Sequence, residues 1–353
     1  MRPDPERPEE AEGVLNPAAV RGRDGELYLF PRLVGRGNFS RIGKARVIFN
    51  ETGDPVEVER LGIALEPTEG YEFRGETGGC EDPRVTYFGP LGLFLMTYTA
   101  WGPQGPRIAL AVSEDLDKWE RRGLVEFEDP DALYCTDFAH YENKDGLIFP
   151  EVVWDPSGRP ALGLIHRPVY EAMSADDSCG APCGIEDPRA SIWISYCPLA
   201  DLRRHFHGGL RVRGHHCLAR PRFEWENVRI GGGPPPLLTA AGWLLVYHGV
   251  ACPPETAEGF SARTYRAGVM VLNQADPRLV HYQSPEPILE PEMAEERGGI
   301  VANVVFPTGL DVRSDLGQPR RVDMYYGMAD SCIGAATFTL PTSTLSNSEK
   351  QSP

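Results

Sequence analysis

The hydrophobic positions of this chain fall in short runs, and no long segment repeats them with a helical period. The runs mix β-branched and aromatic residues with small ones, which favours strands. They cover residues 26–34, 45–50, 92–100, 107–113, 160–168, 191–197, 242–250, 267–273 and 324–330. The 38 glycines and 33 prolines are spread between them and predict many turns. The pattern therefore indicates an all-β chain, with one or two helical turns expected at residues 290–297.

A weak internal repeat suggests how the strands are organised. The tetrapeptide EDPR occurs at Glu81–Arg84 and again at Glu186–Arg189, each time ahead of an apolar strand. Two similar strand corners follow at Ser113–Trp119 and Ser195–Asp201. Repeated four-stranded units are typical of a β-propeller, whose closure protects the sheet edges. A β-sandwich is the alternative, and the repeat is too faint to give a blade count.

Charge excludes some functions and leaves others open. The net charge of −16 argues against binding nucleic acid or an anionic membrane through a broad basic surface. A few convergent arginines can still hold one phosphate against an acidic background. The 41% of hydrophobic residues suffice for a core.

The ends of the chain differ from its middle. The first residues, MRPDPERPEEAEG, are charged and rich in proline, which does not match a secretory signal. No apolar run reaches the roughly 18 residues of a membrane span. We therefore expect a cytoplasmic protein with a flexible arm at residues 1–20, a single catalytic domain at residues 21–342, and a loose tail at residues 343–353.

The eight cysteines are expected to be reduced thiols, since no leader points to an oxidising compartment. Cys179 and Cys183, taken with His215, His216 and Cys217, offer an alternative interpretation as a zinc site. Their spacing matches no familiar ligand pattern, so no metal is expected.

Four segments concentrate polar groups beside glycine and proline. In a propeller, loops of this kind converge at one end of the axis, where ligands bind. The segments are Gly35–Ile42, Gly79–Arg84, Asn143–Glu151 and Asn227–Pro236. Taken singly, each has a structural explanation. Asp82 is a common turn residue, and Arg84 has Glu81 nearby as a partner.

Together and in order, these segments resemble glycoside hydrolase family 130, the β-mannoside phosphorylases and related β-mannosidases. The resemblance runs from about Asn38 to about Thr337. It is carried by residues 81–100, 143–151, 166–168, 192–196, 229–250, 265–273, 303–309 and 325–330. The family fold is a five-bladed β-propeller, which supplies the blade count missing from the repeat.

The resemblance implies a general acid. It is the Asp of the Asn-Lys-Asp stretch, here Asp145, preceded by Asn143 and Lys144. Family enzymes act with inversion, and in the phosphorylases the acid is thought to protonate the leaving oxygen through the mannose O3 hydroxyl. The alternative is that Asp145 is only a turn residue before Gly146.

The resemblance also implies a phosphate site. Phosphate is expected to be held by Arg167, Arg189 and Arg229, with His248 completing the wall. Arginine suits this task because its planar fork matches a phosphate. At the position of Arg229 the family commonly has Lys. These cations favour phosphorolysis, in which inorganic phosphate is the co-substrate and no cofactor is needed.

Other residues are expected to bind the sugar. The candidates are Asn38, Ser40, Asp82, Arg84, Lys144, Tyr247 and Asp330. Tyr98 and Trp101 are further aromatic side chains that either stack on a sugar ring or pack in the core.

Alternatives remain open at this stage. Glu151 and Glu226 are possible bases for water, so a β-mannosidase is the second hypothesis and a non-catalytic glycan-binding propeller the third. The linkage (1,2 or 1,4) and the leaving sugar are undetermined. Unusually long stretches at residues 127–142 and 169–191 adjoin the site and would reshape or cover it. The partner is a small oligosaccharide, and a homo-oligomer is possible.

Overall fold

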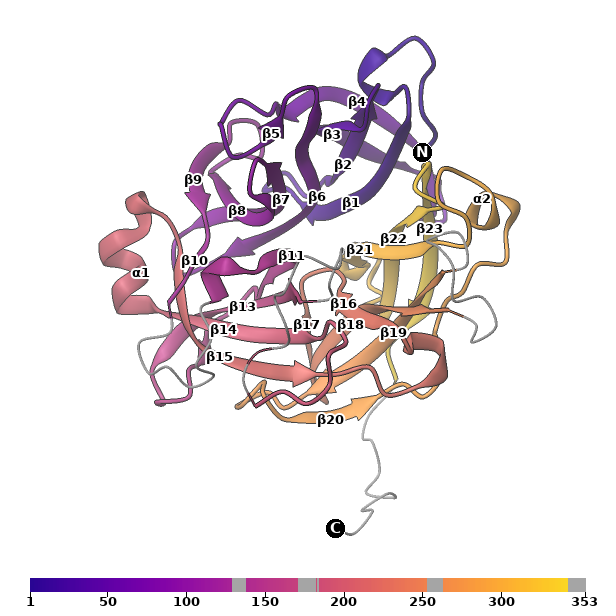
Figure 1. Cartoon of the computed structure of the whole chain (residues 1–353). Helices are drawn as coiled ribbons and strands as arrows, with labels where there is room; N and C mark the ends of the chain where they lie inside the picture. Colours follow the sequence, from indigo (N-terminus) through magenta and orange to yellow (C-terminus); the bar gives the residue numbers. More distant parts are fainter. Residues whose placement is uncertain (129–137, 171–181, 183, 253–262, 342–353) are drawn as a thin grey trace.

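The computed structural model describes residues 1–128, 138–170, 182, 184–252 and 263–341 of the chain. Within these residues the fold is all-β, as the pattern of apolar runs predicts (Figure 1). No helix among them is long and apolar enough to cross a membrane. The tail expected at residues 343–353 lies outside the described residues. So do Cys179 and Cys183 of the alternative zinc site.

The first sheet contains two antiparallel units. The strands of the first unit are β1 (Gly13–Arg21), β2 (Leu27–Gly35), β3 (Phe39–Phe49) and β4 (Pro55–Leu65). Those of the second are β5 (Phe73–Arg74), β6 (Thr77–Phe88), β7 (Leu93–Gly102), β8 (Gly105–Ser113) and β9 (Glu120–Leu124). A short parallel pairing between β3 and β6 joins the units, with Phe39 opposite Gly78 and Ser40 opposite Gly79. This join brings two of the four predicted polar segments side by side.

Three more sheets follow in chain order. The second contains β10 (Glu126–Phe127), β11 (Glu142–Ile148), β12 (Val153–Trp154), β13 (Pro160–Val169), β14 (Ile192–Pro198) and β15 (Arg211–Ala219). The third contains β16 (Arg229–Gly232), β17 (Leu237–Thr239), β18 (Gly242–Ala251), β19 (Thr264–Leu272) and β20 (Val280–Gln283). The fourth contains β21 (Val305–Val312), β22 (Arg321–Met328) and β23 (Cys332–Thr339).

Helical segments are few and short. They are the 3-10 turns η1 (Pro8–Glu10), η2 (Phe138–His140), η3 (Phe206–Gly208), η4 (Glu224–Glu226) and η6 (Ser314–Leu316), and the α-helices α1 (Leu199–His205) and α2 (Ala294–Arg297). The helical turn expected at residues 290–297 is therefore confirmed as α2.

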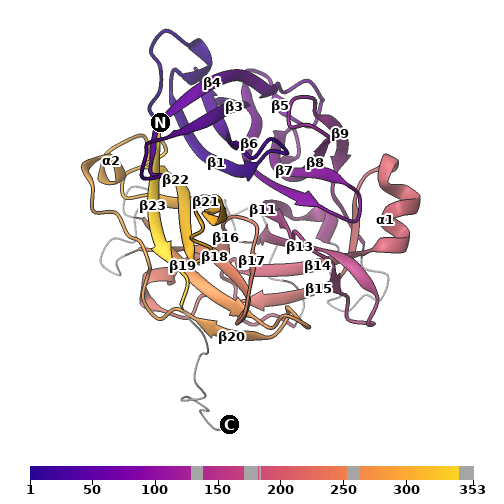
Figure 2. The same ribbon diagram turned by 180° about the vertical axis from the view of Figure 1, so that it is seen from behind.

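The N-terminal segment is part of the fold, which corrects the expectation of a flexible arm at residues 1–20. Strand β1 pairs with β2 and is largely buried. The amino group of Met1 donates to the carbonyl of Ile333 at 2.8 Å, and the Ile333 amide donates to the Met1 carbonyl at 2.9 Å. From both sides of the molecule, the N-terminus lies against β23 (Figures 1 and 2). Apolar side chains such as Val14 and Leu15 explain this, because they are buried by packing.

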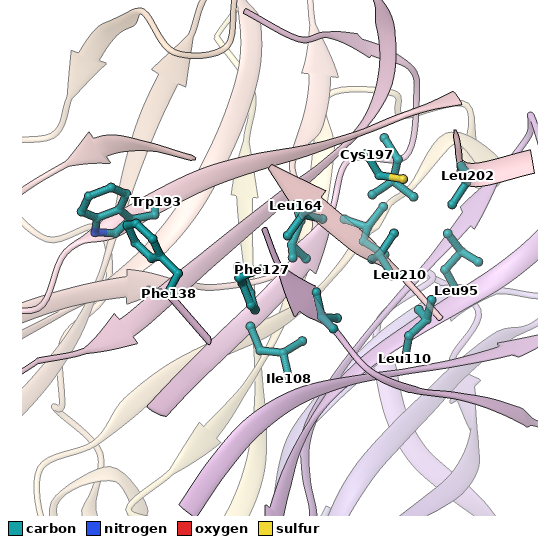
Figure 3. Packing of buried hydrophobic residues seen from close by; sticks show 14 of the residues in the cluster. Leu95, Ile108, Leu110, Phe127, Phe138, Leu164, Trp193, Cys197, Leu202 and Leu210 are labelled. Carbon is teal, nitrogen blue, oxygen red and sulfur yellow. The ribbon is translucent and has the colours of Figure 1, made fainter. Parts of the chain in front are cut away.

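The largest core cluster lies between the second unit of the first sheet and the second sheet. Leu95, Ile108 and Leu110 from β7 and β8 belong to one cluster with Leu164 and Trp193 from β13 and β14 (Figure 3). All five are at most 1% exposed. This packing fixes β11, which carries Asp145, because β11 contacts both β7 and β8.

The two predicted strand corners are not equivalent. The hydroxyl of Ser113 accepts a hydrogen bond from the Leu116 amide at 2.9 Å, as a turn serine does. Ser195 lies inside β14 and is bonded to two histidines instead. The first EDPR lies within β6, and the second lies in a loop before β14. The two copies of the repeat therefore do not occupy equivalent positions in the fold.

Candidate active site

Asp145 lies at an irregularity in β11. Lys144 pairs with Arg167 on β13, but the ladder resumes only at Leu147, so Asp145 falls in a bulge with φ at +54°. Gly146 follows, and its carbonyl accepts a hydrogen bond from the Thr97 hydroxyl of β7 at 2.6 Å. Such a backbone conformation is unfavourable for a residue with a side chain and is typical of functional sites.

The carboxylate of Asp145 forms a buried ion pair. Nε of Arg167 donates to Oδ2 of Asp145 at 2.5 Å, and the two residues are 6% and 4% exposed. Nε2 of His248, on β18, lies 3.8 Å from the same oxygen. The sequence prediction that Asp145, Arg167 and His248 form one site is consistent with this geometry.

Electrostatics keep Asp145 ionised in the free protein. Burial by itself would raise the pKa of Asp145, but the charges of Arg167 and Arg84 outweigh burial and hold that pKa far below its usual range. His248 contributes little, since burial lowers its own pKa to about 3 and leaves the ring neutral near pH 7. The carboxylate therefore faces two permanent cations and a neutral imidazole.

Gly231 is needed because Asp145 and His248 approach the backbone of β16 closely. A Cβ atom at Gly231 would lie 2.3 Å from Oδ2 of Asp145 and 2.4 Å from Cε1 of His248. Distances under about 3 Å are repulsive for carbon. The glycine-rich segment therefore lets β16 and β18 come against the acid.

Arg229 forms the next part of the wall. Its Nη2 donates to the hydroxyl of Tyr265 at 2.6 Å, and the Tyr265 ring stacks with the His248 ring at 6.2 Å between centroids. The charge of Arg229 is one of those that lower the pKa of His248, after the larger effect of burial. Arg229 therefore lies near His248, with Tyr265 in contact with both.

Arg84 was predicted to bind sugar, but its hydrogen bonds are to the backbone. Its Nε donates to the Gly233 carbonyl at 2.6 Å and its Nη1 to the Asp82 carbonyl at 2.8 Å, with the side chain 1% exposed. Its charge acts on Asp145. Arg84 therefore ties β6 to the segment after β16 and supplies positive charge beside the acid.

Arg32 organises the predicted sugar-binding residues, and the sequence analysis missed it. It donates to Oγ of Ser40 at 2.9 Å, to Oδ1 of Asn38 at 3.1 Å and to Oε1 of Glu81 at 2.7 Å. Its Nη1 also lies 3.4 Å from Oδ1 of Asp82. A charged residue in the middle of the apolar run 26–34 was the available signal.

Other groups complete this polar cluster. Asn16, on β1, donates to Oδ1 of Asp82 at 2.8 Å. The ammonium of Lys144 lies 3.8 Å from Oε2 of Glu81 and 4.2 Å from the centre of the Trp101 ring. One face of Trp101 is therefore covered by a cation.

Asp330 belongs electrostatically to the same cluster. Burial raises its pKa to about 6, and the charges of Asp82 and Glu81 add to this while Arg32 and Lys144 oppose it. For Asp82, by contrast, burial is outweighed by Arg32 and Lys144, so the pKa is lowered. Within the cluster, Asp82 is thus firmly ionised, whereas Asp330 titrates near pH 6.

Arg189 was predicted to bind phosphate, and this role stays a prediction; in the structure its guanidinium is engaged by neighbouring groups. It forms a two-point ion pair with Asp187, with Nε 2.9 Å from Oδ1 and Nη2 2.7 Å from Oδ2. The guanidinium also donates to the carbonyls of Pro221 and Asn227. A carboxylate two residues away holds the arginine locally, and the side chain secures a loop.

Tyr247 also lies outside the cluster and was wrongly assigned to the sugar. Adjacent side chains on β18 point to opposite faces, so His248 faces Asp145 while Tyr247 is fully buried on the other side. The Tyr247 hydroxyl donates to Oε2 of Glu226 at 2.7 Å. Tyr98 is likewise a core residue, 2% exposed and bonded to Glu72.

The described part of the protein contains no candidate metal site. Across the residues that the structure describes, no group of three or more His, Cys, Asp or Glu side chains could hold a metal ion. The expectation that no cofactor is needed stays a prediction.

The fold and the site together define a class of enzyme that acts on carbohydrates. The buried carboxylate of Asp145 lies beside the cations of Arg84 and Arg167. The neighbouring cluster offers short carboxylates, an amide and a hydroxyl, all of which can hydrogen-bond to sugar hydroxyls. The chain belongs to glycoside hydrolase family 130, whose sequence model, described as beta-1,4-mannooligosaccharide phosphorylase, matches residues 4–342.

Individual relatives agree with this assignment. A 1,2-beta-oligomannan phosphorylase of Thermoanaerobacter sp. (strain X514) is 30% identical over 346 residues, which cover 96% of this chain and 94% of that protein. A beta-1,4-mannooligosaccharide phosphorylase of Ruminococcus albus is 37% identical over 203 residues, 56% of this chain and 48% of that protein. The solved beta-1,2-mannobiose phosphorylase of Listeria innocua shares the fold, with a TM-score of 0.68 at 23% identity over 93% of this chain and 90% of that one.

Proposed function

We propose that this protein is an inverting β-mannoside phosphorylase. It would cleave a short β-linked mannoside with inorganic phosphate and release α-mannose 1-phosphate and the shortened sugar. The observation that carries the proposal is the contact between Asp145 and Arg167, with Arg84 and Arg229 close by. A reaction with a dianion needs such cations beside the acid.

The chemistry balances without a cofactor. The bond from the anomeric carbon to the leaving oxygen breaks, and a phosphate oxygen forms a bond to that carbon from the opposite face. Asp145, which is ionised in the free protein, would take a proton from bound H₂PO₄⁻ and pass it to the leaving oxygen, through the mannose O3 hydroxyl as the family resemblance implies. The HPO₄²⁻ that remains attacks the anomeric carbon and leaves as the mannose 1-phosphate monoanion, and Asp145 returns to its ionised resting form.

The two glutamates that would activate water are badly placed for hydrolysis. Glu226 is fully buried and accepts from Tyr247 and Gln283 and from the amides of Arg222 and Phe223. Glu151 is exposed and lies in the segment that follows β11, six residues after Asp145. This supports phosphorolysis over the mannosidase alternative.

For the linkage, we propose β-1,2. The relative that matches 96% of this chain is named a 1,2-beta-oligomannan phosphorylase. The relative named for β-1,4 linkages matches a shorter part of the chain.

One incubation tests the activity. Purified protein is mixed with β-1,2- and β-1,4-mannobiose, with and without phosphate, and the products are separated. The expected result is mannose 1-phosphate from the β-1,2 disaccharide only when phosphate is present. Equal release of free mannose in both tubes would establish a mannosidase, and no turnover of either sugar would support a binding protein.

We also propose that the strands form five blades around one axis. The units β1–β4, β6–β9, β11–β15, β16–β20 and β21–β23 follow each other in chain order, which supports this arrangement. Contacts of β1 with both β6 and β21 support closure of the ring. The cytoplasmic location and a homo-oligomer stay predictions.

A further inference from the structure

A chain of buried hydrogen bonds crosses the second sheet from β11 to β15. Nδ2 of Asn143 lies 3.0 Å from Nδ1 of His166, and Nε2 of His166 lies 2.8 Å from Oγ of Ser195. Oγ of Ser195 lies 2.7 Å from Nδ1 of His215, and Nε2 of His215 lies 2.9 Å from the carbonyl of Glu128. The four side chains are at most 3% exposed.

The last carbonyl sets the direction of every bond in the chain. A carbonyl only accepts, so Nε2 of His215 carries the proton, and in a neutral ring Nδ1 then accepts from Ser195. The Ser195 oxygen then accepts from Nε2 of His166. Burial keeps the pKa of His166 well below its usual range, so its Nδ1 is bare and accepts from the Asn143 amide. One tautomer of each histidine satisfies the whole chain.

Aromatic rings surround this chain. The ring centre of Phe127 lies 4.7 Å from that of His166, and the ring centre of Phe138 lies 4.5 Å from that of His215. The rings of Phe138 and Trp193, whose centres are 5.0 Å apart, lie side by side in Figure 3. In such apolar surroundings an unsatisfied polar group costs about 1–3 kcal/mol. This series of hydrogen bonds is therefore stable only when all of its bonds are made together.

The inner end of the chain lies beside the proposed acid. Asn143 precedes Asp145 by two residues on β11, and His166 directly precedes Arg167 on β13. The backbone ladder between these strands is interrupted after Lys144. The bond between Asn143 and His166 thus ties the strands together next to the interruption.

We propose that His166, Ser195 and His215 are positioning residues for the proposed phosphorolysis. Through Asn143 they hold the bulge of β11 against β13, and so keep the carboxylate of Asp145 aligned with Arg167 and with the sugar. None of the three touches the reacting atoms. The inference rests on the proposed function.

The test compares two buried serines. Ser195→Ala removes the central link of the chain. Ser191→Ala is the matched control, since its hydroxyl is equally buried and donates to the Arg189 carbonyl at 2.8 Å outside the chain. Each variant is assayed with phosphate on β-1,2-mannobiose and on 2,4-dinitrophenyl β-mannoside, whose leaving group needs no proton. Thermal unfolding verifies that both variants are folded.

In Ser195→Ala, kcat on mannobiose should fall about tenfold or more, because small misplacements of a catalytic group are costly. The rate on the dinitrophenyl substrate should stay within about threefold, because that reaction does not use the acid. Ser191→Ala should keep both rates, and Ser195→Cys, which retains a weak donor, should recover part of the loss.

An equal loss on both substrates, or the same behaviour in Ser191→Ala and Ser195→Ala, would overturn the positioning role. Absence of phosphorolysis in the wild-type protein would instead overturn the proposed function. If Ser195→Ala does not fold, the ¹⁵N shifts of the histidine rings in the wild-type protein decide. Protons on Nε2 of both His166 and His215 are expected, and any other tautomer contradicts the chain.

Discussion

Nε of Arg167 lies 2.5 Å from Oδ2 of Asp145, so the proposed acid rests as the anion of a buried ion pair. Under the proposed reaction Arg167 has two partners in turn, Asp145 in the free protein and phosphate in the complex. Phosphate that draws the guanidinium away leaves Asp145 less stabilised as an anion and favours its protonation. When phosphate is absent, Arg167 keeps Asp145 ionised. Asp145 then has no proton for the leaving oxygen, which would limit hydrolysis.

Replacing Asp145 by Asn tests the acid directly. Phosphorolysis of mannobiose should fall by about 10²–10⁴-fold, the usual contribution of a general acid. Turnover of a dinitrophenyl mannoside with phosphate should fall far less. Both rates are measured from the sugar phosphate formed. Full activity of Asp145→Asn on mannobiose would remove Asp145 from this role.

Two arginines should behave differently when changed to Lys. Arg167→Lys loses the planar fork at Asp145. KM for phosphate should therefore rise about tenfold or more, which corresponds to the free energy of one charge-assisted hydrogen bond. Arg189→Lys is the comparison and should leave KM for phosphate within about twofold, because the ion pair with Asp187 already engages its guanidinium. Steady-state kinetics with varied phosphate measure both. A large rise in Arg189→Lys would place that residue in the phosphate site.

Gly231→Ala should abolish most activity without preventing folding. The new methyl group would lie 2.3 Å from Oδ2 of Asp145, so the carboxylate or β16 must move. A shift of about 1 Å costs about 10²-fold in rate. Gly89→Ala is the matched control, with nothing within 4 Å of its added Cβ. Comparable kcat values in the two variants would contradict the close approach described for β16.

Asp330 should make stability depend on pH. Its pKa is raised to about 6 in the folded protein, so the folded state binds more protons than the unfolded state between about pH 4 and 6. The free energy of unfolding should therefore fall as pH rises through this window. Asp330→Asn should raise the melting temperature at pH 7 and have little effect at pH 4. The same shift at both pH values would argue against a raised pKa.

Glu226→Gln separates phosphorolysis from hydrolysis. Because Glu226 accepts bonds from Tyr247 and two backbone amides, the change should lower the free energy of unfolding by about 1–3 kcal/mol. Phosphorolysis per folded molecule should change little. Denaturant unfolding and kcat are measured on the same preparation. Loss of all turnover in a folded Glu226→Gln protein would favour the mannosidase mechanism.

Local sequence was a good guide where the chemistry lies in one strand. The Asn-Lys-Asp stretch drew attention to Asp145, which lies at the bulge of β11 beside Arg167. The first EDPR drew attention to Asp82, which Arg32 and Asn16 contact. Local sequence says less where a nearby group competes for the same side chain. The second EDPR looked equivalent, yet Asp187 holds Arg189 in a loop.

The role of Arg32 was hidden for a different reason. It stands within an apolar run, and its meaning comes from Ser40 on the next strand and Glu81 on β6, 49 positions away. Periodicity shows that such a side chain is unusual, but not which groups it meets.

By itself, the sequence determined an all-β chain, its family resemblance and a candidate acid, because strand propensity, turns and short motifs are local properties. Only the tertiary structure decided which side chains surround the carboxylate of Asp145. Arg84, Arg167 and His248 come from β6, β13 and β18, and they converge because apolar packing between sheets brings these strands together. The bulge at Asp145 and the alternation of His248 with Tyr247 then fix which side chains face the site, and these depend on register rather than composition.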